Sequence, residues 1–393
     1  MHFIYIFLYI FLMVFFIGLI ILAHESGHFL CSKMLGVRVD KFAFGLPFCG
    51  PVIFRKKIWN TEIVIHLLFF FGGYVVYPDS NPNSDLPLDS NHRFLNKTPF
   101  EKILITLSGI FMNILVSFIL IMLIGIIWKV IPANDYNVKF LSFKNNAQAS
   151  ITTSGLEKGD IIYSINNKKL KDNIALQEYL RVYYKPLKEK RKQENIIEHN
   201  TNNLLIFYPD IYVKQTNTLN NIIVIREGKK LQLTPVYANE DFSLGINTEI
   251  KENFLVVNSV SSLFKNTAKS IINQLYLLLY YVKELVTGQL SITDIRGIIS
   301  IVKIGSELSF YDSLYRGLWL MSFLSINMAV VNLIPFPVLD GGRLLIILSG
   351  RMFQKKVKRK TMNNILSFAF KLFYVIANLI LLNDIIAIIS GVV

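Results

Sequence analysis

The sequence predicts a polytopic α-helical membrane protein with four transmembrane helices, a membrane-associated β-hairpin and an inserted extracytoplasmic α+β domain. Of its 393 residues, 52% are hydrophobic and 17% are charged, with a mean hydropathy of +0.44, which is too apolar for a water-soluble protein of this size. Several uncharged runs are long enough to cross a bilayer. The net charge of +14 suits nucleic acid or an anionic membrane surface, and the uncharged runs favour the membrane. We therefore expect a lipid bilayer around the chain and no nucleic-acid partner.

Three runs without a charged residue predict membrane spans at about 3–23, 103–127 and 317–339, because each reaches the roughly 20 residues that a spanning helix needs. A fourth span is expected at about 365–383. It contains only Lys371, whose long side chain can reach the interface. The first run lacks the charged n-region of a signal peptide, so we expect it to stay attached.

The orientation follows from the segment 343–361 between the third and fourth spans, which we interpret as a cytoplasmic loop. It is rich in basic residues and has no acidic one, as positive-inside loops do. These residues are Arg343, Arg351, Lys355, Lys356, Lys358, Arg359 and Lys360. Alternation then places both termini and the long middle segment outside, and the ends of the first and third spans on the cytoplasmic side.

We expect three parts: an N-terminal membrane part (1–127), an extracytoplasmic domain (128–252) and a C-terminal membrane part (253–393). The middle part returns to mixed polarity and predicts a hairpin turning at Glu227-Gly228. The apolar run at about 263–287 is short and contains polar residues, so an interfacial helix is more consistent with it than a fifth span.

The first span runs into His24-Glu25-Ser26-Gly27-His28, an HExxH pattern. A spacing of four puts both imidazoles on one helical face, where two nitrogens can bind one zinc ion at about 2.0 to 2.1 Å. Glu25 lies beside them and can accept a proton from a metal-activated water. The pattern predicts a catalytic metal site for amide hydrolysis. The alternative, a chance match whose histidines bind neighbouring backbone groups, is a weak competitor.

A catalytic zinc ion usually has a third protein ligand. The candidates by residue type are His66, His92, Asp294, Glu307 and Asp340. Only Asp340 ends a long span on the same side as the histidines. Two prolines precede it and two glycines follow it, which favours irregular backbone lining a cavity. The alternative is that Asp340 caps a helix beginning near Arg343.

Together, these segments resemble the bacterial site-2 proteases, which are intramembrane zinc metalloproteases. The resemblance rests on the HExxH pattern, on Asn-x-x-Pro-x-Pro-x-Leu-Asp-Gly from Asn332 to Gly341, and on the external domain between them. Shorter matching segments are 71–75, 94–97, Ser108-Gly109 with Asn113, and 297–301. Ile110 and Ile298 depart from the family pattern, which commonly has proline there.

By position, the resemblance implies that His24, His28 and Asp340 are the ligands of one catalytic Zn²⁺ and that Glu25 is the catalytic base. It further implies that Asn332 contacts the substrate backbone, although a hydrogen bond between helices is the alternative. Gly72, Gly73 and Asn113 are further candidate substrate-binding residues.

The external domain resembles a PDZ domain at Gly155–Ile162 and in the hairpin ending at Pro235. A PDZ-like fold would bind peptide ends or admit substrates by size, and a plain spacer is the alternative. Between the first two spans, the segment at about 52–77 predicts a membrane-dipping hairpin whose open edge accepts substrate as an added strand; a hairpin that only covers the site is the alternative.

We therefore expect an endopeptidase in the bacterial inner membrane. Its substrates would be single-span membrane proteins already cut outside the membrane: anti-sigma factors, membrane-bound regulators or signal-peptide remnants. The competing hypothesis is a non-catalytic membrane receptor whose PDZ-like domain binds peptide ends.

Overall fold

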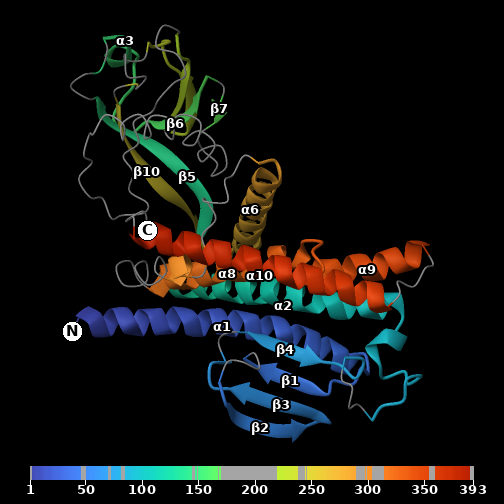
Figure 1. The fold of residues 1–393 in the computed structure, drawn as a ribbon. Helices are drawn as coiled ribbons and strands as arrows, with labels where there is room; N and C mark the ends of the chain where they lie inside the picture. Colours follow the sequence, from blue (N-terminus) through green and yellow to red (C-terminus); the bar gives the residue numbers. More distant parts are fainter. Residues whose placement is uncertain are drawn as a thin grey trace. The chain divides into compact units, whose positions relative to one another are not determined.

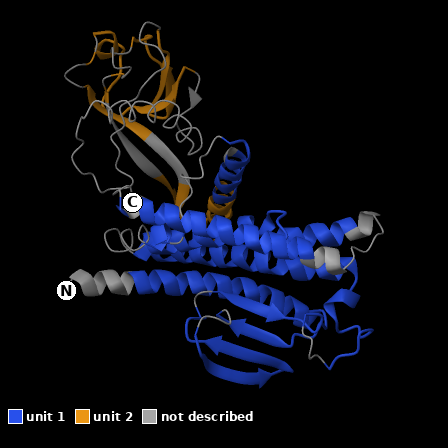
Figure 2. Cartoon of the chain, viewed as in Figure 1, with its two compact units in different colours: residues 1–128, 274–393 blue, residues 129–273 orange. Residues whose placement is uncertain are grey.

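Figure 1 shows the computed structural model of the chain. The chain forms two compact units. Unit 1 comprises 1–128 and 274–393, and unit 2 comprises 129–273 (Figure 2). The second predicted boundary, at 252, falls inside a strand of unit 2. The structure describes residues 2–45, 50–69, 72–80, 85–143, 147, 149–166, 168–169, 219–237, 244, 246–288, 297, 299–302, 314–353 and 359–389.

Among the described residues, unit 1 contains four helices that are long and apolar enough to span a membrane, as the sequence predicts. They are α1 (His2–Met34), α2 (Pro99–Trp128), α8 (Leu314–Leu333) and α10 (Arg359–Ile389). The helix α2 packs against both α1 and α8. Buried residues of α1 and α8, among them Ile20 and Met321, form an apolar cluster. Most side chains of α10 are exposed, as expected of a helix that faces lipid.

The predicted spans differ from these helices at functionally important ends. The helix α1 does not end at the HExxH pattern but continues to Met34, so the pattern lies within it. The helix α8 ends at Leu333, six residues before the predicted end of the third span. Much of the predicted cytoplasmic loop is helical, because α9 (Asp340–Phe353) occupies its first part.

The start of α2 is specified locally. Thr98 and Glu101 form a capping box, in which the Glu101 carboxylate accepts from the Thr98 backbone N–H at 2.9 Å and the Thr98 hydroxyl accepts from the Glu101 N–H at 3.3 Å. Pro99, at the first helical position, has no N–H to satisfy. The capping box and Pro99 therefore fix the residue at which α2 begins.

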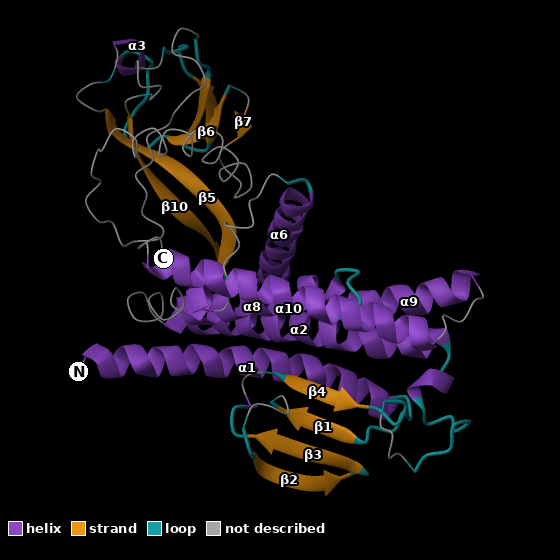
Figure 3. Ribbon diagram, in the orientation of Figure 1, coloured by secondary structure: helices purple, strands orange, loops and turns teal. Residues whose placement is uncertain are grey.

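The segment that joins α1 to α2 in the sequence forms a four-stranded sheet with the order β2-β3-β1-β4, which lies on the side of α1 away from α2 (Figure 3). Its strands are β1 (Lys41–Phe44), β2 (Val52–Ile58), β3 (Thr61–His66) and β4 (Gly73–Val76). The strands β2 and β3 form a hairpin around Trp59 and Asn60, both at positive φ (48° and 58°). The predicted hairpin at 52–77 is thus corrected: β4 pairs with β1, a strand that the sequence did not reveal.

Unit 2 contains an antiparallel sheet with the strand order β10-β5-β6-β8-β9. The short strand β7 (Lys168–Lys169) also pairs with β6. Its strands are β5 (Val130–Phe143), β6 (Ile161–Ile165), β8 (Ile222–Arg226), β9 (Lys229–Gln232) and β10 (Ile246–Val256). The short helix α3 (Ala149–Thr152) contributes Ile151 to the apolar core. The predicted turn at Glu227-Gly228 joins β8 to β9, with both residues at positive φ.

The helix α6 (Val260–Val286) includes the boundary between the units. A helix was expected at about 263–287, and α6 covers nearly the same residues. Its position at the membrane interface stays a prediction. The charged, Asn-rich stretch from Lys185 to Asn203, which the sequence suggests is an insertion in the external domain, lies outside the described residues. The likeness of unit 2 to a PDZ domain stays a prediction.

Candidate metal centre

Two histidines one turn apart on α1 form the first half of the site. His24 and His28 are each 5% exposed, and their rings meet edge to face with 4.8 Å between centroids. The Nε2 atoms lie 3.2 Å apart. The four-residue spacing produces this arrangement because it returns to the same helical face after about one turn.

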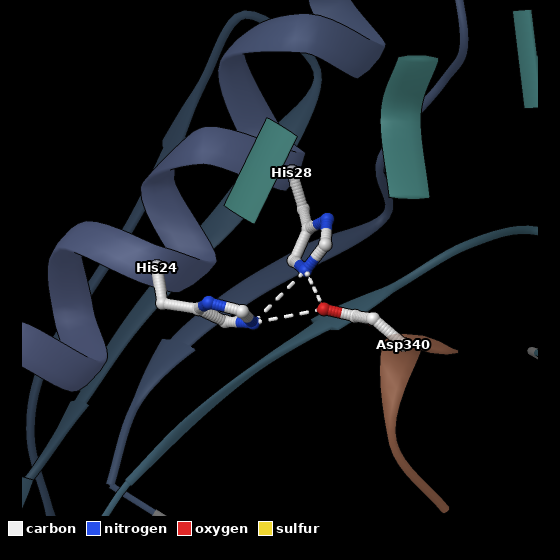
Figure 4. Close-up of side chains that lie close together, drawn as sticks. All are labelled: His24, His28 and Asp340. Carbon is white, nitrogen blue, oxygen red and sulfur yellow. Dashed lines mark hydrogen bonds and ion pairs between the residues drawn. The ribbon is translucent and has the colours of Figure 1, made fainter. Parts of the chain in front are cut away.

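Asp340 completes the cluster from more than 300 residues away in sequence (Figure 4). Its Oδ2 lies 3.0 Å from Nε2 of His24 and 3.1 Å from Nε2 of His28. The carboxylate is 8% exposed. Among the described residues, these three form a group whose ligand atoms can hold one metal ion.

The dimensions of this triangle fit a tetrahedral metal. Ligand atoms at about 2.0 to 2.1 Å from zinc in tetrahedral geometry are about 3.3 to 3.4 Å apart. The observed edges of 3.0, 3.1 and 3.2 Å need only a small expansion to match. Two imidazoles and one carboxylate form a common donor set for catalytic zinc, which leaves a fourth position for water or substrate.

Asp340 reaches this position from the irregular segment that joins α8 to α9. A Cβ atom on Gly341 would collide with the backbone carbonyls of Leu333 and Ile334, and one on Gly342 would collide with the carbonyl of Phe336. The two glycines thus allow the chain to fold back on itself beside the carboxylate. The helix α9 begins at Asp340 itself rather than near Arg343, while the carboxylate points at the histidines.

Two further glycines bring α1 and α2 into contact at the site. A Cβ on Gly27 would collide with the backbone carbonyl of Ser108. A Cβ on Gly109 would lie 2.5 Å from Nε2 of His28 and 2.8 Å from Cε1 of His24. Gly27 thus allows α1 to pack closely against α2, and Gly109 provides the space in which both imidazoles lie.

Glu25 points from α1 toward the edge strand β4. A Cβ built on Gly73 would lie 3.2 Å from its Cγ, so the glycine lets the carboxylate pass close to the strand. Glu25 is half-buried and close enough to His24, His28 and Asp340 for electrostatic interaction. The structure therefore brings the predicted base beside the candidate metal ligands.

The other nitrogens of the imidazoles have partners on α2. Nδ1 of His28 lies 2.8 Å from the carbonyl oxygen of Ile105. Nδ1 of His24 lies 3.3 Å from Nδ2 of Asn113. Asn113, a candidate substrate-binding residue by sequence, is fully buried and lies beside a candidate ligand.

The other candidate residues from the sequence have no described contact with the three candidate ligands. Asn332 is half-buried in the last turn of α8, and Gly72, with φ 129°, immediately precedes β4. His66 and His92 lie beside backbone carbonyls of Gly50 and Gly36, and no described contact links them to the cluster. The candidates Asp294 and Glu307 lie outside the described residues.

Comparisons with known proteins identify one family. Residues 12–376 match the family model described as "Peptidase family M50". A protein of Clostridium perfringens named "Putative zinc metalloprotease CPE1693" is 28% identical over 376 residues, which cover 93% of this chain and 95% of that protein. "Membrane metalloprotease ARASP, chloroplastic" of Arabidopsis thaliana is 25% identical over 340 residues, covering 84% of this chain and 68% of that protein.

Proposed function

The chain belongs to peptidase family M50, the site-2 protease family, and on this premise we propose that it is an intramembrane zinc endopeptidase. The observation that carries the proposal is the convergence of His24, His28 and Asp340 inside a unit with four candidate membrane spans. Polar groups at membrane depth are costly to bury, so three of them around one point favour a functional site. The names of relatives support zinc as the metal.

The residues divide the chemistry between them. His24, His28 and Asp340 would hold the zinc ion, which when bound would lower the pKa of an attacking water molecule and polarise the scissile carbonyl group. Glu25 takes the proton that the water gives up and returns a proton to the leaving amine. Gly109 and Gly73 leave room for the ligands and for the base.

The edge of β4 is where we propose that the substrate binds. The carbonyls of Gly72 and Val76 accept hydrogen bonds from backbone N–H groups of Gly45 and Asp40 on the β1 side. Because the backbone N–H and C=O groups of successive residues in a strand point to opposite sides, those of Gly73 and Val75 point away from β1. A peptide bond in a helix is shielded by its own hydrogen bonds, and pairing with this edge would hold a substrate extended beside Glu25.

The β2-β3 hairpin has the composition of a membrane-dipping element. Val52, Ile53 and Phe54 are exposed at one end of β2, and the basic run Arg55-Lys56-Lys57 follows them. Apolar side chains suit the acyl region, and basic ones suit anionic headgroups. This distribution supports the proposed approach of the sheet to the membrane.

We place the enzyme in the bacterial inner membrane, with both termini and unit 2 outside and the metal centre toward the cytoplasm. Four spans put both termini on the same side, and the basic residues of α9, Arg343 and Arg351, favour the cytoplasm for the connection between α8 and α10. Substrates would be single-span proteins after a first extracytoplasmic cut: anti-sigma factors, membrane-bound regulators or signal-peptide remnants. Unit 2 would act as a PDZ-like filter that admits the trimmed forms.

Cleavage by the full chain in liposomes, with a single-span reporter lacking its external domain, tests the proposal. We expect the wild type to cleave it and Glu25→Gln to keep zinc but lose at least about 100-fold in rate. Glu101→Gln, at the start of α2, is the matched control and should cleave normally. Wild-type rates in Glu25→Gln would refute the mechanism, and peptide binding without cleavage by the wild type would favour a receptor.

The role of Asp340 needs a separate measurement. Asp340→Asn should weaken zinc retention as well as activity, because a carboxylate ligand is lost. A role limited to the start of α9 would change stability and leave zinc binding intact. Zinc content after dialysis, compared with that of Asp160→Asn in unit 2, distinguishes the two.

A further inference from the structure

A buried amide on α2 lies directly behind one of the candidate metal ligands. The side chain of Asn113 is 0% exposed, and its Nδ2 is 3.3 Å from Nδ1 of His24. Its Oδ1 is also buried and has no hydrogen-bond partner among the described residues. An unpaired buried acceptor is energetically unfavourable, so its position calls for an explanation.

The explanation comes from the protonation of the two imidazoles. Both histidines turn Nε2 toward Asp340, so a shared metal ion would take the Nε2 lone pairs. A neutral imidazole that binds a metal through Nε2 carries its proton on Nδ1 and needs an acceptor there. His28 has one, the carbonyl of Ile105 at 2.8 Å.

His24 faces an amide instead of a fixed carbonyl. With Nδ2 of Asn113 toward it, Nδ1 of His24 is the acceptor and Nε2 keeps the proton, which it can donate to Asp340 at 3.0 Å. The Nε2 lone pair is then unavailable to a metal. When Oδ1 of Asn113 faces His24, Nδ1 of His24 carries the proton and donates it to Oδ1. Nε2 of His24 is then free to coordinate a metal ion.

We propose that Asn113 is a positioning residue for the metal centre: its Oδ1 accepts the Nδ1 proton of His24 when the ion is bound. A half-turn of the amide exchanges Oδ1 and Nδ2, which are nearly equal in size, so the change needs little space. It pairs Oδ1 with the N–H of His24 and moves Nδ2 to the position where Oδ1 now has no partner among the described residues. The orientation of the amide and the tautomer of His24 are thereby linked.

The backbone around Asn113 is fixed from a second helix. The hydroxyl of Ser325 on α8 donates to the Asn113 carbonyl at 2.8 Å, and one turn further the hydroxyls of Ser117 and Ser322 lie 2.6 Å apart. These contacts hold α2 against α8, the helix that leads toward Asp340. The amide therefore has a rigid support, which positioning of a ligand requires.

The inference rests on the proposed zinc site, and the zinc affinity of the purified full chain tests it. Asn113→Leu removes the acceptor at similar size and should weaken zinc binding about 10- to 100-fold. Asn113→Asp keeps an acceptor and cannot donate, so it should bind zinc within a few-fold of the wild type. Ile121→Val, a conservative change at a fully buried position on the same helix, is the control and should bind as the wild type does.

The readouts are competition with a chromophoric chelator and the visible absorption of the cobalt-substituted protein, which reports ligand geometry. Equal zinc affinity in Asn113→Leu and the wild type would overturn the inference and leave the proposed function standing. Loss of zinc in Asn113→Asp to the same extent as in Asn113→Leu would overturn the acceptor role. If the wild type itself binds no zinc, the proposed function fails first.

Folding is checked by thermal unfolding with excess chelator, where Asn113→Leu should match the wild type. If Asn113→Leu does not fold, Asn113→Ala removes the acceptor without adding bulk. A change in KM or kcat of Asn113→Leu at saturating zinc, with unchanged zinc affinity, would assign Asn113 to the substrate and contradict the proposal.

Discussion

Gly109 of α2 lies directly against the imidazole of His28, so that a Cβ built on it would be 2.5 Å from Nε2. The helices cannot separate to make room without losing the contact of Gly27 with the backbone of Ser108. We therefore expect Gly109→Ala to displace the imidazoles, at a cost of about 1 to 3 kcal/mol in the free energy of unfolding and with a larger relative loss of zinc binding.

Zinc content and thermal unfolding of the full chain measure the two effects of Gly109→Ala. Ile119→Ala, on an exposed part of α2, is the control for an alanine in this helix and should retain zinc. Full zinc occupancy and activity in Gly109→Ala would show that the close approach is not required.

The proposed substrate edge predicts an effect of proline on β4. Val75→Pro removes an N–H that we place on the open edge, while the pairing of β4 with β1 uses the groups of Gly72, Tyr74 and Val76. We expect cleavage of the reporter to fall at least about 10-fold with zinc affinity unchanged, since one or more backbone hydrogen bonds to the substrate are lost.

The matched change for that experiment is Tyr74→Pro, which interrupts the β1-β4 pairing and should destabilise the sheet itself. If Val75→Pro cleaves as the wild type does while folding normally, substrate does not pair with this strand.

The sequence was sufficient for features encoded locally. The four candidate spans follow from the length of uncharged runs, and the histidine pair follows from a four-residue spacing. The turn at Glu227-Gly228 follows from its residue types. Each depends on neighbours in the chain, which is what hydrophobic periodicity and turn chemistry report.

Features that depend on distant pairing were missed. The strand β1 has four residues and no periodicity long enough to identify it, so β4 was assigned to the wrong partner. The predicted fourth span stopped at 383, because a carboxylate normally ends an apolar run, whereas α10 continues past Asp384. The space that Gly109 provides is visible only once α1 and α2 are packed together.

In unit 2, Asp160 and Arg226 predict a pH dependence of stability. Burial by itself raises the pKa of Asp160, but hydrogen bonds from the Arg226 guanidinium, both at 2.8 Å, and from the Glu157 N–H bring the pKa below its usual value. A carboxyl group whose pKa is lower when folded stabilises the fold above its unfolded pKa of about 3.9. That contribution is lost as the pH falls through the lower, folded pKa.

Amide hydrogen exchange of β6 and β8 in the full chain, compared at each pH between the wild type and Asp160→Asn, measures this effect. The wild type should be better protected above about pH 5, and the difference should shrink below about pH 4. A difference that is constant across this range would show that the charge of Asp160 does not contribute.

The buried carboxylate of Asp384 on α10 connects the fourth candidate span to residues 297, 299 and 300. Asp384 is 0% exposed and accepts hydrogen bonds from the backbone of Gly297 at 2.8 Å, Ile299 at 3.0 Å and Ser300 at 3.2 Å, and from the Ser300 hydroxyl at 2.7 Å. Asp384→Leu leaves these donors unpaired in an apolar setting, so we expect a loss of at least about 2 kcal/mol in the free energy of unfolding in detergent.

Two further variants are the controls for this measurement. Asp384→Asn keeps one acceptor and should lose less stability. Asn378→Ala, an exposed polar change on the same helix, should lose almost none. Equal stability of Asp384→Leu and the wild type would mean that these hydrogen bonds do not hold α10 in place.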